Sequence, residues 1–233
     1  METAKPHTKK SSKLNWTKPI FLALIATVFT VLVTKVDVQP AGVENTNIGF
    51  ATINVLVHNT FGYNDTFYKL TEILGVLPFL TIAFFVVVGV AQLVKHKKPS
   101  KELLCLVGFY VVVFALYVLF EKLALNFRPV ILEEGIEASY PSSHTLFAMT
   151  LCGSAILVAK RLFSENHAGL VKLGNLTLVV LALAIVFGRL FSGVHWLTDI
   201  VGGLLISAAL VSILQACLDA VGPHKLPKSS NHA

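Results

Sequence analysis

Two short stretches of sequence, YPSSHT at residues 140–145 and GRLFSGVHWLTD at residues 188–199, decide the fold and the chemistry expected of this chain. Each stretch stands at the edge of a long apolar segment, and together they hold two histidines, an arginine and an aspartate. Ionisable side chains at a membrane edge are costly and are usually kept there for a function. These residue types suit a cationic pocket in which one imidazole attacks phosphorus and the other protonates a leaving oxygen.

The composition around these stretches is that of a polytopic membrane protein. Of the 233 residues, 55% are apolar and only 14% are charged. A soluble domain of this size could not bury so much apolar surface. The formal net charge is +6, but the basic residues lie in short loops beside apolar segments, which argues against a nucleic-acid partner. Three cysteines lie inside apolar stretches, so we expect no disulfide.

Six apolar segments approach the roughly 20 residues that a helix needs to cross the hydrocarbon core. Pro78 lies inside the second of them, where neighbouring helices can satisfy the carbonyl that a kink frees. The sequence therefore predicts an all-α, polytopic bundle of six transmembrane helices in one domain over residues 1–233. The segments cover about residues 19–35, 71–94, 103–121, 144–160, 173–190 and 196–218.

Lysine and arginine residues predict the orientation of the bundle. With the N-terminus inside, 14 of the 19 basic residues fall on the cytoplasmic side. This predicts a multi-pass protein of the cell membrane with both termini cytoplasmic, as tails at residues 1–18 and 219–233. Residues 36–70 would form an extracytoplasmic loop, in which residues 41–63 fit either an interfacial helix or an ordered loop. The outer side keeps only Lys35, Lys69, Lys122, Arg128 and Arg189.

The first motif predicts the start of a helix. Pro141 precedes an apolar helical run, with Ser142 or Ser143 as its N-cap. The free N–H groups and the positive dipole end of such a helix make an anion site, and His144 falls in the first turn beside it. A capped helix with an incidental histidine is the simpler alternative, but the second cationic loop on the same face favours the anion site.

The second motif predicts a histidine–carboxylate pair. His195 and Asp199 stand four residues apart, so they share a face if one helix carries both. A carboxylate that accepts a hydrogen bond from one imidazole nitrogen leaves the other nitrogen free to attack. Arg189, across a glycine-containing turn, can fold back to bind phosphate oxygens. A metal site at the His–Asp pair and a purely structural hydrogen bond are the alternatives left open.

Together with Lys122 and Arg128-Pro129 upstream, these stretches resemble the three-part signature of the type 2 phosphatidic acid phosphatase (PAP2) superfamily. That signature has a lysine upstream of Arg-Pro, then Pro-Ser-Gly-His, then an arginine followed by a histidine and an aspartate. It spans about residues 120–200 here, and the six-segment layout extends the resemblance over most of the chain. The fold implied is the helical bundle shared by PAP2 phosphatases and vanadium haloperoxidases.

The resemblance implies a role for each matched residue. His195 would be the nucleophile that forms a phosphohistidine, Asp199 would orient it, and His144 would be the general acid. No metal or other cofactor is implied, because cationic side chains supply the electrostatic stabilisation. The residues implied to bind the phosphoryl oxygens are Lys122, Arg128, Ser142, Ser143 and Arg189.

Three positions depart from the family pattern. Ser143 replaces the glycine before the histidine, and Gly188 stands where a serine often precedes the arginine. Family spacing places the lysine at Glu121, so Lys122 comes one residue late, a shift of about 100° around a helix.

The function that the resemblance implies is that of a bacterial-type membrane lipid phosphatase with its site on the extracytoplasmic face. Its partner would be a phospholipid or polyprenyl phosphate from the bilayer: undecaprenyl diphosphate, phosphatidylglycerol phosphate or phosphatidic acid. The sequence does not choose among these substrates. A lipid phosphotransferase that uses the same histidine and a non-catalytic lipid-phosphate binder or scramblase are the two alternatives.

Overall fold

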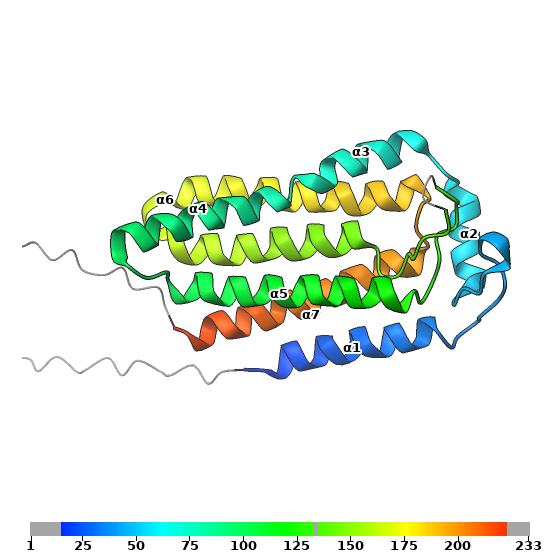
Figure 1. The fold of residues 1–233 in the computed structure, drawn as a ribbon, viewed down its shortest axis with the longest axis horizontal. Coiled ribbons are helices and arrows are strands. Elements are labelled where there is room, and N and C mark those ends of the chain that lie inside the picture. Colours follow the sequence, from blue (N-terminus) through cyan, green and yellow to red (C-terminus); the bar gives the residue numbers. More distant parts are fainter. Residues whose placement is uncertain (1–14, 133–134, 223–233) are drawn as a thin grey trace, which may run out of the picture.

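The computed structural model describes residues 15–132 and 135–222, and the regular elements in this part of the chain are helices. Figure 1 shows the long helices side by side, with α2 at one end of the bundle. The tail residues 1–14 and 223–233 named above lie outside the described residues. The helices are α1 (Thr17–Val33), the 3-10 turn η1 (Val43–Asn45), α2 (Ala51–Phe61), α3 (Asp65–Val76), α4 (Phe79–His96), α5 (Lys101–Leu123), α6 (Ser143–Ser192) and α7 (Leu197–Ala220).

The described residues contain 5 helical segments that are long and apolar enough to cross a membrane. A sixth apolar helix, α1, is shorter at 17 residues and corresponds to the first predicted segment. The prediction of an all-α bundle with six hydrophobic helices is confirmed. The 5 longer segments are Asp65–His96, Lys101–Leu123, Ser143–Phe163, His167–Ser192 and Leu197–Ala220.

Three of the predicted segments differ from the structure in their boundaries or connections. The second segment begins earlier than residue 71, at Asp65, and Pro78 divides it so that α3 ends at Val76 and α4 begins at Phe79. Proline causes such a break because it lacks the N–H of a helix interior. The fourth and fifth segments form a single element, α6, which folds back where His167 has non-helical dihedral angles (φ −139°, ψ 40°).

The last helix, α7, is the most buried of the segments long enough to span a membrane, and α6 packs along it. Its residues Ile206, Leu210 and Leu214 join side chains from α1, α4, α5 and α6 in the main hydrophobic core. The outward faces of the other helices carry large apolar side chains that remain exposed, such as Val94 and Leu170. A large apolar exterior of this kind is typical of a protein surrounded by lipid.

The stretch 41–63, for which sequence left a helix and an ordered loop open, contains the helix α2. Ala51 of α2 and the preceding Ile48 pack against Trp196, just before α7. The fully buried Asn54 accepts a hydrogen bond from Thr198 N at 3.1 Å and donates one to Thr198 Oγ1 at 2.9 Å. This end of the bundle is therefore covered by α2, which satisfies backbone groups at the start of α7.

Candidate active site

His195 and Asp199 lie where α7 begins. The helix starts at Leu197, so His195 precedes the helix instead of lying on it. Asp199 Oδ2 accepts a hydrogen bond from Trp196 N at 2.9 Å and lies 3.6 Å from His195 Nδ1. Both side chains are buried. The structure brings the predicted pair together through a helix cap and not through a shared helical face.

Asn126 holds the same carboxylate from a second side. Its Nδ2 donates to Asp199 Oδ1 at 3.4 Å, and its Oδ1 accepts from Gly49 N at 3.4 Å. Asn126 is almost completely buried, two residues before Arg128. Sequence reasoning did not select this residue, because an asparagine in a loop carries no pattern of its own.

The start of α6 places His144 beside this pair. Ser142 is the N-cap, as predicted, and its Oγ accepts a hydrogen bond from Thr145 N at 3.4 Å. Ser142 N donates to Asp199 O at 3.0 Å, which joins the two sequence motifs directly. Ser143 is the first residue of the helix and His144 the second, so the His144 ring lies in the first turn.

Arg189 lies in the last turn of α6, and the fold of this helix brings it beside His144. It is completely buried, and its guanidinium contacts His144 Nε2 and lies 2.5 Å from Glu72 Oε1. Glu72 Oε2 lies 3.6 Å from His144 Nε2. The Tyr68 ring covers the guanidinium at 5.4 Å from its centroid. One carboxylate thus bridges a histidine and an arginine that α6 brings together by folding back.

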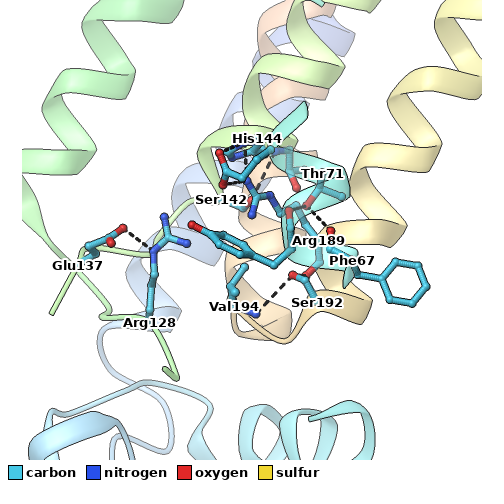
Figure 2. A network of polar contacts seen from close by, with 12 residues as sticks. Phe67, Thr71, Arg128, Glu137, Ser142, His144, Arg189, Ser192 and Val194 are labelled. Atoms are coloured by element: carbon cyan, nitrogen blue, oxygen red, sulfur yellow. Dashed lines mark hydrogen bonds and ion pairs between the residues drawn. The ribbon is translucent and has the colours of Figure 1, made fainter. Parts of the chain in front are cut away.

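Arg128 approaches from the loop between α5 and α6. Its Nε lies 2.9 Å from Glu137 Oε2, and its backbone N donates to Glu137 O at 3.0 Å. Figure 2 shows the Arg128 side chain facing the group formed by His144 and Arg189. The two arginines predicted to bind phosphate therefore lie on different elements and point into one region.

Lys122 lies in the last turn of α5 with an exposed side chain. Its neighbour Glu121, which is also exposed, lies within electrostatic range of Arg128 and Glu137. Successive residues point about 100° apart on a helix, so only one of the pair faces the loop. The one-residue offset from the family spacing thus leaves a glutamate on the side where the lysine was expected.

Helix α3 is a part of the site that sequence reasoning missed. Tyr68, Thr71, Glu72 and Gly75 follow the spacing of one helical face, and that face lies against α6. A Cβ added at Gly188 would come within 2.4 Å of Thr71 Cγ2, which gives a reason for glycine where the family often has serine. The missed signal was Glu72 itself, a charged residue at the edge of an apolar segment.

Several buried nitrogens in this region have no hydrogen-bond partner among the described residues. They are Arg128 Nη1, Arg189 Nε and Nη1, His144 Nδ1 and both ring nitrogens of His195. Buried polar groups are normally paired, so the N–H donors of the two arginines and His144 gathered here suit an anionic ligand. A neutral His195 ring has one N–H donor and one nitrogen with a lone pair.

The electrostatics of the region act most strongly on His195. Burial, followed by the positive charges of Arg128, Arg189 and His144, lowers the pKa of His195 well below its usual value. At neutral pH the ring is therefore uncharged and keeps a lone pair with which it can attack an electrophile.

These features define a class of protein: a polytopic helical membrane protein with a cluster of buried arginine and histidine side chains at one end of the bundle. The family model of the PAP2 superfamily matches residues 79–222, more than half of the sequence, and the chain belongs to this superfamily. The resemblance drawn from the motifs is confirmed, and the chain is a multi-pass membrane protein of a phosphatase family. A comparison with curated protein sequences gave no match.

A solved structure supports the fold. The crystal structure of the first transmembrane PAP2-type phosphatidylglycerolphosphate phosphatase from Bacillus subtilis is similar, with a TM-score of 0.66 over 91% of this chain and 100% of that chain. The sequence identity is 14%, so the likeness extends to the fold and not to the substrate. The family match begins at Phe79, and α3 with its contacts to the site lies before it.

Proposed function

We propose that this protein is a metal-independent lipid phosphatase that hydrolyses a lipid phosphomonoester or diphosphate through a phosphohistidine. The observation that carries the proposal is the set of unpaired buried donors on Arg128, Arg189 and His144 around a neutral His195. A phosphoryl group offers oxygens to each of these donors and an electrophilic centre to the histidine.

In the first half of the reaction, His195 Nε2 attacks phosphorus, because Nδ1 is the ring nitrogen that faces Asp199. The bond between phosphorus and the leaving oxygen breaks, and His144 donates a proton to that oxygen. Asp199 stabilises the positive charge that forms on the His195 ring, while Arg128 and Arg189 stabilise the phosphoryl oxygens.

In the second half, a water molecule gives a proton to His144 and attacks the phosphohistidine. The bond between phosphorus and nitrogen breaks, inorganic phosphate leaves, and both histidines return to their starting state. Among the described residues, no group of three His, Cys, Asp or Glu side chains could hold a metal ion. The proposal gives the electrostatic work to the two arginines.

The proposed substrate enters from the bilayer. The apolar outer faces of the helices would allow an acyl or prenyl chain to remain in lipid while its phosphate reaches the pocket. Phosphatidylglycerol phosphate, undecaprenyl diphosphate and phosphatidic acid all fit this requirement, and the similar Bacillus subtilis protein is described as acting on the first.

The proposal is tested by phosphate release from these three lipids, with the full chain purified in detergent and EDTA present. We expect release from at least one lipid, and its loss in His195→Ala. The matched control is Asp65→Asn, an exposed position at the start of α3. Activity that disappears on chelation and returns only with magnesium would contradict the metal-independent mechanism.

The same preparation separates the alternatives. Transfer of labelled phosphate to a second lipid instead of water would indicate a phosphotransferase. Lipid transfer that survives His195→Ala, in a protein that never releases phosphate, would indicate a binder or scramblase.

A further inference from the structure

Each arginine of the proposed site already has a carboxylate partner. Arg128 pairs with Glu137 at 2.9 Å, and Arg189 pairs with Glu72 at 2.5 Å. The two carboxylates differ in their origin, because Glu137 belongs to the same loop as Arg128, whereas Glu72 comes from α3, which lies outside the family match. Glu72 is therefore a feature of this chain that the three family motifs do not contain.

The position of Glu72 is held by close packing of α3. A Cβ added at Gly75 would come within 2.5 Å of His144 Cδ2 and 2.8 Å of His144 Nε2, so only glycine allows the helix to lie this near the ring. One turn earlier, the Thr71 methyl group fills the space beside Gly188. These two contacts, made by α3 residues that are four positions apart on one face, direct Glu72 toward Arg189.

The Glu72 carboxylate pairs with Arg189 Nη2, one nitrogen of the guanidinium group whose Nε and Nη1 have no partner among the described residues, so it competes with a phosphoryl group for the charge of Arg189 and for one of its donors. Carboxylate and phosphoryl oxygens make the same charge-assisted hydrogen bonds to a guanidinium group. The Arg189 side chain is completely buried, so the surrounding residues hold it in place. The Glu72 side chain is 44% exposed and can rotate away from Arg189 into solvent. When an anion arrives, the carboxylate is thus the partner that moves.

Resting on the proposed function, we propose that Glu72 is an internal competitor for the phosphate subsite at Arg189, which weakens phosphate binding so that inorganic phosphate leaves readily after each turnover. The competition weakens the binding of every phosphate group by the same factor. A lipid substrate recovers affinity through its apolar chain in the bilayer, and inorganic phosphate has no such contribution. The product therefore leaves readily, and free phosphate inhibits weakly.

The test is direct titration of the purified full chain with inorganic phosphate, which needs no turnover. Glu72→Gln keeps the shape of the side chain and removes the charge, and it should bind phosphate about fivefold more tightly, the factor for one partly exposed ion pair. Glu72→Asp withdraws the carboxylate by one methylene and should show a smaller gain. Asp65→Asn removes an exposed charge from the same helix and should bind as the wild type does.

Steady-state kinetics of the same variants provide a second test of the role of Glu72. With a lipid substrate, Glu72→Gln should lower KM and the inhibition constant of phosphate together without raising kcat, and Glu72→Asp should do so to a lesser degree. Phosphate affinity that is unchanged or weaker in Glu72→Gln would overturn the inference, because the carboxylate would then support Arg189 instead of competing for it. If no lipid is hydrolysed by any variant, the proposed function fails, while the phosphate titration still decides the role of Glu72.

Discussion

Asp199 combines two roles in one side chain. One carboxylate oxygen caps α7 through Trp196 N and lies 3.6 Å from His195 Nδ1, and the other accepts from Asn126. In Asp199→Asn the amide can still accept from Trp196 N, but it cannot supply the negative charge that the histidine needs when it becomes phosphorylated. We expect kcat for phosphate release to fall on the order of 10³-fold with little loss of folded protein.

The measurement is the initial rate of phosphate release, with the thermal unfolding midpoint of each variant in detergent as a check on folding. Asn54→Asp provides a comparison at a second buried position that contacts the start of α7 without contacting His195. A rate in Asp199→Asn within a few fold of the wild type would mean that Asp199 serves only as a helix cap.

The lowered pKa of His195 predicts the acid side of the pH profile. The neutral ring is the nucleophile, so activity should persist as pH falls below the ordinary histidine pKa and fail only when the ring finally takes up a proton. The groups that set this pKa besides burial are Arg128, Arg189 and His144. Replacing Arg128 with Gln removes one positive charge and should raise the pKa of His195, so the acid limb of kcat/KM should move to higher pH.

The profile is measured as kcat/KM against pH for the wild type and Arg128→Gln with one lipid substrate. Ionisation of the substrate phosphate is common to both proteins, so a difference between their acid limbs belongs to the enzyme. An acid limb that stays in place or moves to lower pH would show that the Arg128 charge does not act on His195.

The residues that sequence could identify are those whose type and spacing carry the chemistry. His144, Arg189, His195 and Asp199 stand in ordered motifs, and the structure places them together. Glu72 and Asn126 could not be found in this way, because they reach the site through the packing of α3 and through a loop that pairs with the segment before α2. Lys122 stays a prediction, since its type fits the motif but it comes one residue late in the family spacing.

At the scale of elements, the path of α6 brings the site together. The helix begins at the capped His144, folds back near His167 and returns with Arg189 in its last turn, so one element supplies both sides of the pocket. Apolar periodicity predicted the two halves, and Pro78 indicated the break between α3 and α4. The approach of α3 to α6 could not be predicted, because it depends on two glycines that each make room for a side chain of the other helix, Gly75 for His144 and Gly188 for Thr71.

The glycine at that contact gives a prediction for the element. Gly75→Ala should displace either α3 or the His144 ring, because the added Cβ would lie within 2.5 Å of His144 Cδ2. A displacement of about 1 Å at a catalytic group can cost on the order of 10²-fold in rate, so we expect kcat to fall by about 10–100-fold. Gly89→Ala in α4 is the matched control, since its added Cβ would meet only Leu103 Cδ1 at 3.7 Å.

Phosphate release and helix content are compared in the two variants. Equal rates in Gly75→Ala and Gly89→Ala would show that α3 can move away from His144 without consequence for the chemistry. A loss of rate in Gly75→Ala alone, at unchanged helix content, would confirm that α3 belongs to the catalytic end of the bundle.

For the whole molecule, the order of the helices places the lysine- and arginine-rich connections at one end of the bundle and the candidate active site at the other. The start of α6, its end and the start of α7 all meet at the end covered by α2 (Figure 1). The connection between α4 and α5 and the bend of α6 must then lie at the other end, and these hold the basic clusters around Lys98 and Arg161. Because basic clusters remain in the cytoplasm, the pocket should open on the extracytoplasmic side, toward lipids of the outer leaflet.

Single-cysteine labelling in intact cells tests this orientation, in a background where Cys105, Cys152 and Cys217 are replaced by alanine. Asn59→Cys lies on the exposed face of α2, and Lys98→Cys lies in the exposed connection between α4 and α5. A membrane-impermeant maleimide should label Asn59→Cys in intact cells and Lys98→Cys only after permeabilisation. The reverse pattern would put the pocket on the cytoplasmic side, where lipid phosphates of the inner leaflet would be its substrates. The position that the maleimide labels in intact cells therefore also identifies the membrane leaflet that supplies the substrate.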